Sequence, residues 1–211
     1  MALKLGPNQH HEFDIEAAAA RVGLDPAALA ALIAAEAAVL NGRWDPQARN
    51  SRTSAAGLTQ FLEKTWLELA THAATWLHDE ALARGLVAAS GQIVDRAQVL
   101  AMRLEPKAAI MTAADYARLN LATLARAGFI PTDADHAARL AYLAHHEGAA
   151  GALAMLQDRL DERRAERLFK VNVGPARAQQ LRAAAGSWAA AYGTWLTGYV
   201  EGRIVPARFR V

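Results

Sequence analysis

The sequence has no cysteine among its 211 residues. Structural disulfides, zinc sites built on thiolates and thiol catalysis are therefore excluded. No Gly-x-Ser-x-Gly segment is present either, so the nucleophile elbow of serine hydrolases is missing. Glycine (14) and proline (7) are modest, and runs of β-branched residues are scarce, so little in the chain opposes helix formation. The alanine-rich remainder predicts an all-α protein.

Long apolar runs and a strong net charge are also missing. The uncharged stretch 183–200 contains glycine, serine and threonine, so we expect a packed terminal helix and no stable membrane insertion. Residues 1–14 lack the apolar segment of a Sec-type signal, which predicts synthesis in the cytoplasm. A net charge of +2 does not indicate a nucleic-acid partner. We expect a monomer with one domain over 1–211, in which helices of 156–211 pack on core motifs at 25–155.

Caps and breaks divide the chain into expected helices, with an irregular segment at 41–58. One helix begins at Asp25, and another bears Tyr142 and His145 and breaks at Gly148. Pro175 and Ser187 open the last two helices. The other helices are expected at 14–22, 62–76, 78–89, 95–103, from 106 to about 127, and at 151–169.

Glu36 is the first candidate for chemistry. Asp25 and Pro26 form a helix start, and the large apolar residues that follow recur at helical spacing around Glu36, at 29, 32, 33, 39 and 40. A carboxylate on such a face is desolvated and holds its proton to higher pH, as a general acid must. Two other interpretations remain open: Arg43 or Arg49 pairs with Glu36, or the helix is rotated so that Glu36 is exposed.

The segment 50–61 is polar and rich in small residues in a chain otherwise built of alanine and leucine. Its glycine allows a ligand to approach the backbone, and its side chains offer donors and acceptors that suit a sugar. The same composition suits a capped surface loop. The candidate ligand-binding residues are Asn50, Thr53, Ser54, Thr59 and Gln60.

These segments together resemble the soluble lytic transglycosylases, a family that cleaves peptidoglycan. The resemblance rests on a helix bearing Glu36, on the segment from Ser54 through Gly57 to Phe61, on Thr65-Trp66, and on Tyr142-Leu143-Ala144-His145. The sequence from Gly57 to Phe61, followed by Thr65-Trp66, is especially similar to that of phage endolysins with this domain. Thr59 stands where many members have methionine, and the loop after Glu36 is longer than usual.

The resemblance implies a lysozyme-like multi-helix domain with a glycan cleft beside the Glu36 helix. It implies that Glu36 is the sole acid and base in cleaving the MurNAc–GlcNAc bond with a 1,6-anhydro product, and that no cofactor is needed. Gln60 and Thr53 or Ser54 would hold the glycan strand, and Tyr142 would hydrogen-bond near Glu36. The expected setting is a phage endolysin that acts on the cell wall after release.

Two alternatives stay open at this point. A hydrolysing muramidase normally needs a second acid, for which Asp45 and Glu147 are the candidates. A non-catalytic wall-binding module could keep the same fold.

Histidines and aromatic residues give weaker signals. His145, His146, Glu147 and His136 do not have the spacing of a zinc site, so we expect no metal, with His145 facing the cleft and His146 without a special role. An aromatic stripe on the last helix could stack on sugars, but its period is more typical of core packing. The stripe consists of Trp188, Tyr192, Trp195 and Tyr199. We expect the charged stretch 158–167 and the terminal arginines to be solvated.

Overall fold

The computed structural model describes residues 2–211 and is 67% helical, with ten α-helices and one two-stranded sheet. The all-α prediction is therefore confirmed at the level of fold class. The helices are α1 (Glu12–Val22), α2 (Pro26–Glu36), α3 (Glu63–Ala70), α4 (Trp76–Ala83), α5 (Arg96–Ala101), α6 (Pro106–Arg126), α7 (Ala134–Leu156), α8 (Glu162–Val173), α9 (Pro175–Ala185) and α10 (Trp188–Arg203). The strands are β1 (Val39–Leu40) and β2 (Arg43–Trp44), and 3₁₀ turns lie at η1 (Gly6–His11), η2 (Met102–Leu104) and η3 (Pro206–Phe209).

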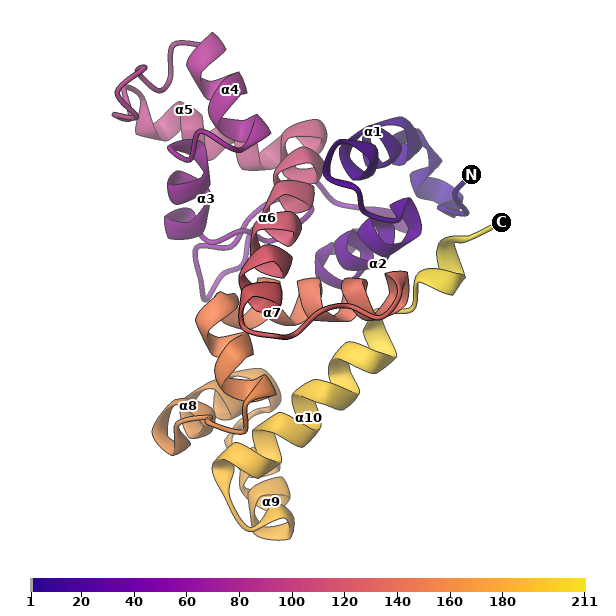
Figure 1. Cartoon of the computed structure of the whole chain (residues 1–211), viewed down its shortest axis with the longest axis vertical. Helices are drawn as coiled ribbons and strands as arrows, with labels where there is room; N and C mark the ends of the chain where they lie inside the picture. Colours follow the sequence, from indigo (N-terminus) through magenta and orange to yellow (C-terminus); the bar gives the residue numbers. More distant parts are fainter. Residues whose placement is uncertain (1) are drawn as a thin grey trace.

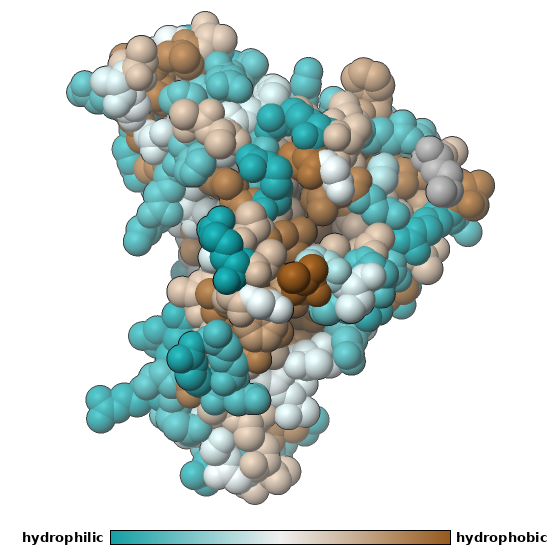
Figure 2. Space-filling view, in the orientation of Figure 1, coloured by the Kyte–Doolittle hydropathy of each residue, from teal (hydrophilic) through white to brown (hydrophobic). Residues whose placement is uncertain are grey.

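The molecule has a central group of helices with an extension at each end. Helices α1, α2, α6 and α7 form the centre, α3 to α5 lie at one end, and α8 to α10 lie at the other (Figure 1). The two chain ends meet beside α2, where the Lys4 amide donates to the Phe209 carbonyl at 2.9 Å. In the space-filling view, apolar side chains occupy the middle of this face and hydrophilic ones border it above and below (Figure 2).

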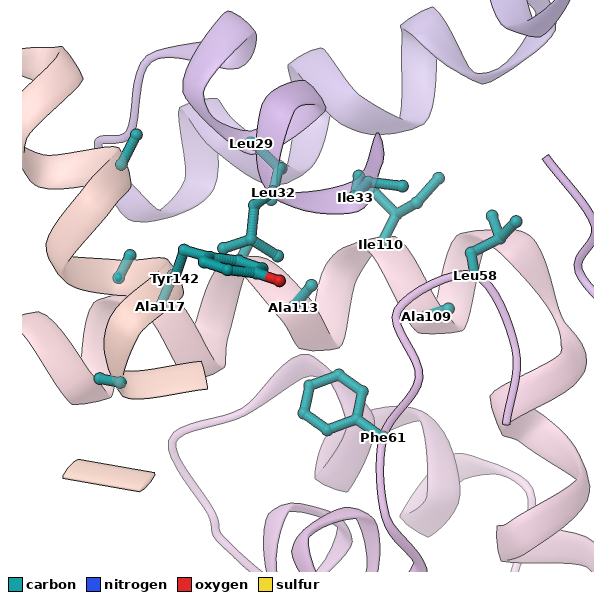
Figure 3. Packing of buried hydrophobic residues seen from close by; sticks show 14 of the residues in the cluster. Leu29, Leu32, Ile33, Leu58, Phe61, Ala109, Ile110, Ala113, Ala117 and Tyr142 are labelled. Atoms are coloured by element: carbon teal, nitrogen blue, oxygen red, sulfur yellow. The ribbon is translucent and has the colours of Figure 1, made fainter. Parts of the chain in front are cut away.

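The core is centred on α6, which packs against α1, α2, α4 and α7. Ala109, Ala113 and Ala117 are buried on α6, and their small side chains let the neighbouring helices approach closely. Leu32 from α2 and Tyr142 from α7 meet over this surface (Figure 3). The start of α2 is as predicted, because the Asp25 carboxylate accepts from the amides of residues 27 and 28 at 2.7 and 3.1 Å.

The prediction was wrong at the other end of α2. The helix ends at Glu36, and residues 39 and 40 form a strand that pairs with Arg43 and Trp44. Val39 is 67% and Leu40 60% exposed, so neither belongs to the buried face of the helix. The hairpin turn is Asn41-Gly42, with φ of 52° and 76°, the positive values that a type I′ turn requires. This dipeptide is a strong hairpin signal that the helical interpretation of the segment overlooked.

Other boundaries were confirmed in part. Pro106 opens a long helix, and Gly148, with φ of 72° and ψ of 157°, breaks the helical backbone inside α7. The expected helix 62–76 ends early, at Ala70, and the helix expected at 78–89 is α4, which begins at Trp76 because Thr75 caps it by accepting from the amide of His78. The expected helix 151–169 is divided, since α7 ends at Leu156 and Asp161 caps a separate α8.

Among the described residues, no single helix has the length and apolar character needed to cross a membrane. One bent pair, Gly6–Val22 with Pro26–Glu36 at 118°, meets the criteria by length and composition only.

Candidate functional site

A cleft of about 460 Å³ opens between the α3 end and the α8–α10 end of the molecule. It gathers residues from six helices and from the segment between β2 and α3. Six of the predicted site residues line it: Glu36, Asn50, Thr53, Gln60, Tyr142 and His145. The lining also includes Ala35, Ala55, Phe61, Leu62, Thr65, Tyr116, His146, Asn172 and Tyr199.

Glu36 projects into this cleft from the last turn of α2. It is half-buried, because the helix ends there and one side of the carboxylate is open to the cleft. Arg43 and Arg49 are exposed, and no ion pair within residues 2–211 involves Glu36. The structure therefore does not support pairing of Glu36 with either arginine. The sequence analysis placed Glu36 on an apolar helix face that continues to residue 40. The structure instead places it at the end of α2, half-buried at the edge of the cleft.

Tyr142 is the side chain that meets Glu36 across the cleft floor. It is 1% exposed, and its ring lies between α2 and α6 (Figure 3). Burial raises the pKa of Tyr142 well above its usual range, and the charge of Glu36 and hydrogen bonding with Glu36 and Tyr199 add to this. The phenol therefore keeps its proton and can donate to the Glu36 carboxylate.

The segment 50–61 forms one wall of the cleft through its own turns. The Asn50 side-chain oxygen accepts from the amides of Arg52 and Thr53 at 2.9 and 3.2 Å. Gln60 has a φ of 47°, a left-handed value that is uncommon outside glycine, and its Nε2 donates to the Gly57 carbonyl at 2.8 Å. Such backbone persists where the surroundings hold it, and it is frequent at binding sites.

Arg103 and Gly57 fix this wall against η2. Arg103 is 4% exposed, and its guanidinium donates to the carbonyls of Ser54 at 2.6 Å and Phe61 at 3.2 Å. At Gly57 the φ is +78°, and a Cβ placed there would lie 1.9 Å from the Arg103 carbonyl oxygen. The sequence analysis expected Gly57 to let a ligand approach the backbone. The close contact is instead made with the Arg103 carbonyl, and this contact holds the wall in place.

Ser54 and Thr59, predicted to bind glycan, do not line the cleft. The exposed Ser54 hydroxyl accepts from the Glu63 amide at 3.1 Å, and so satisfies the first turn of α3. Thr59 is 1% exposed, so its side chain is not open to the cleft. Its backbone carbonyl accepts a hydrogen bond from His145 Nε2 at 3.1 Å. For both residues the structure supports a local structural contact in place of a ligand contact.

His145 joins α7 to the cleft wall. Burial lowers its pKa, outweighing the opposing charge of Glu36, so the neutral ring donates to Thr59 through Nε2. Its ring meets Phe61 edge-on with centroids 5.0 Å apart, and Tyr116 at 5.7 Å. It thus faces the cleft as predicted, one helical turn from Tyr142.

The two candidates for a second acid lie outside the cleft lining. Asp45 accepts from the Gln47 amide at 2.9 Å within a turn. The side chain of Glu147 is 1% exposed and is bound by His146, Arg164 and Tyr192. Among the described residues that line the cleft, Glu36 is the only carboxylate.

Several cleft residues were missed or given another role by the sequence analysis. His146 was expected to have no special role, and Tyr199 to be core, yet both line the cleft. Tyr192 of the aromatic stripe is fully buried as predicted, whereas Trp188, Trp195 and Tyr199 are half-buried. Tyr116 and Asn172, on α6 and α8, carried no local signal, because only tertiary packing brings them to Glu36.

A larger groove of about 760 Å³ runs along α10, lined mostly by small residues together with Met155, Leu160, Asp158 and Glu201. It lacks the aromatic side chains of the cleft, so the cleft is the better candidate site. In the part of the chain that the structure describes, no group of three or more histidine and acidic side chains could hold a metal ion. No protein-family model and no curated protein matches this chain.

Proposed function

We propose that the protein is a lytic transglycosylase that cleaves the MurNAc–GlcNAc bond of peptidoglycan, with Glu36 as acid and base. The observation that carries the proposal is a cleft in which the lining residues of the described chain provide one carboxylate, Glu36, beside the phenol of Tyr142. A hydrolysing muramidase of the usual kind needs a second carboxylate across the bond. A transglycosylase does not, because the substrate supplies its own nucleophile.

The reaction proceeds in two proton transfers. Protonated Glu36 gives its proton to the glycosidic oxygen as the bond to the anomeric carbon breaks. The resulting carboxylate takes the proton from the 6-hydroxyl of the same muramic acid residue, and that oxygen bonds to the anomeric carbon. The product is a 1,6-anhydro sugar, no water is consumed, and Glu36 ends protonated as it began.

The remaining lining residues have the chemistry for binding a glycan strand. Asn50, Thr53 and Gln60 offer hydrogen bonds on one wall, while the aromatic rings of Tyr116 and Tyr199 offer faces for sugar rings. Tyr142 donates to the Glu36 carboxylate formed after the first proton transfer. We propose a lysozyme-like fold for this helical arrangement, and, from the sequence resemblance, a phage endolysin acting on the cell wall after release.

Mass analysis of digested sacculi tests the reaction type. Muropeptides ending in 1,6-anhydro sugars are expected, which are lighter by one water than the reducing ends that a hydrolysing muramidase produces. Reducing ends from the same substrate would replace the transglycosylase with the muramidase.

A further inference from the structure

The wall of the cleft formed by α7, α8 and α10 carries a histidine, His146, that the proposed reaction does not use. We propose that His146, oriented by Glu147, binds a carboxylate of the glycan substrate. The inference rests on the proposed function, and it adds a specificity determinant to the same cleft.

Glu147 is buried and lies outside the cleft lining, where three side chains hold its carboxylate. Tyr192 donates to Oε1, and the Arg164 guanidinium lies 3.3 Å from Oε2 and 3.1 Å from the Glu147 carbonyl. The third partner is His146, whose Nδ1 lies 3.0 Å from Oε1. A buried carboxylate with three fixed partners keeps one orientation, so it fixes the plane of the imidazole.

His146 itself remains open to the cleft, with 20% of its side chain exposed. With Nδ1 committed to Glu147, Nε2 is the ring nitrogen at the cleft edge, beside Tyr199. The exposed side chain of Asn172 also hydrogen-bonds to His146, and a ligand carboxylate would take its place. Burial lowers the pKa of His146, but the hydrogen bond and charge of Glu147 outweigh it and set the pKa above its usual value. When charged, the ring offers an Nε2–H to an anion.

The other charges around the cleft leave this role to His146. No lysine or arginine is among the described lining residues, and burial lowers the pKa of His145, which keeps that ring neutral. The charge of Glu36 also acts to raise the pKa of His146, but the ion pairs of residues 2–211 do not join the two side chains. Among the described lining residues, His146 is therefore the side chain that can offer a positive charge to a substrate carboxylate.

The shared ligand chemistry is a carboxylate, and peptidoglycan offers it from two sources. One is the peptide attached to muramic acid, with its side-chain and terminal carboxylates. The other is the lactyl group of muramic acid, which is a free carboxylate only where the peptide has been removed. Four preparations of glycan strands distinguish the two sources. The strands carry peptides or lack them, and in each case their carboxylates are either free or chemically amidated.

Binding of these four strand preparations is measured with Glu36→Gln, so that the strands are not consumed. A charge-assisted hydrogen bond at a partly exposed site gives a preference of about tenfold for free over amidated carboxylates. Adding His146→Gln to this background removes the preference, whereas adding His72→Gln, at an exposed histidine outside the cleft, retains it. Glu147→Gln, folded as judged by circular dichroism, reduces the preference because His146 loses its oriented, charge-stabilising partner.

A preference that survives His146→Gln, or its absence in the background protein that still binds strands, overturns the inference. The source is identified by whichever pair, peptide-bearing or peptide-free, shows the preference. Cleavage by the protein with intact Glu36 is followed separately on the free strands. If the Glu36→Gln background shows no carboxylate preference while the protein with intact Glu36 cleaves the strands, only the role of His146 is refuted. Binding with the preference but without cleavage refutes the proposed reaction and leaves that role standing.

Discussion

Replacing Gly57 by alanine tests whether the wall bearing Gln60 is held by close backbone contact with η2. The residue has φ of +78°, and the added Cβ would lie 1.9 Å from the Arg103 carbonyl oxygen and 2.9 Å from its carbonyl carbon. The left-handed backbone costs an alanine about 1 kcal/mol, and relieving the overlap by backbone shifts costs about 1–3 kcal/mol more. The expected loss is about 2–4 kcal/mol in the free energy of unfolding, measured by urea denaturation.

Gly85→Ala is the matched control for that measurement. Its φ is +70°, and a Cβ there meets nothing within 4 Å, so only the backbone cost of about 1 kcal/mol applies. Glycan binding is expected to weaken in the Gly57 variant and not in the control, because the wall moves only in the former. Equal losses of stability in the two variants would show that the contact with Arg103 contributes nothing.

Two further predictions concern Glu147 and Tyr142. Glu147→Gln is expected to cost about 1–3 kcal/mol at neutral pH, because it removes the charge of a buried carboxylate that pairs with the partly exposed Arg164. Burial acts to raise the pKa of Glu147, but His146, Tyr192 and Arg164 hold it below the usual 4.5, so this stability is present above about pH 4.5 and declines as the pH falls through the lowered pKa. Urea titrations in which the difference between wild type and variant grows as the pH falls below about 4.5 would contradict this. Tyr142→Phe removes a donor to the Glu36 carboxylate and is expected to lower kcat about 10- to 100-fold with little change in thermal stability, so an unchanged kcat would remove Tyr142 from the mechanism.

Local signals in the sequence were enough to predict the start of α2 and the break in α7. Asp25 followed by Pro26 caps a helix whatever the tertiary context, and Gly148 interrupts one. The end of α2 was missed because residues 39 and 40 continue the helical spacing by coincidence. The Asn41-Gly42 turn decides that segment in favour of a hairpin.

The candidate site was predictable where the residues lie close together in the chain or in a segment with a family resemblance. Six predicted residues meet in one cleft, but Ser54 and Thr59 serve local contacts that composition alone cannot distinguish from ligand contacts. His146, Asn172 and Tyr199 were not predicted as cleft residues, since their position depends on how α8 and α10 pack against α7. Tyr199 lies on the same helix face as the buried Tyr192, so its period indicated core packing.

The central claim is tested most directly by the rate at which Glu36→Gln clears purified sacculi. The variant keeps the size of the side chain but cannot donate and recover a proton, so the account predicts a rate lower by about 10²- to 10⁴-fold. Asp45→Asn, which changes a carboxylate outside the cleft lining, is expected to clear sacculi at the wild-type rate. Equal clearance by wild type and Glu36→Gln would contradict the account, and absence of clearance by the wild type would favour a wall-binding module.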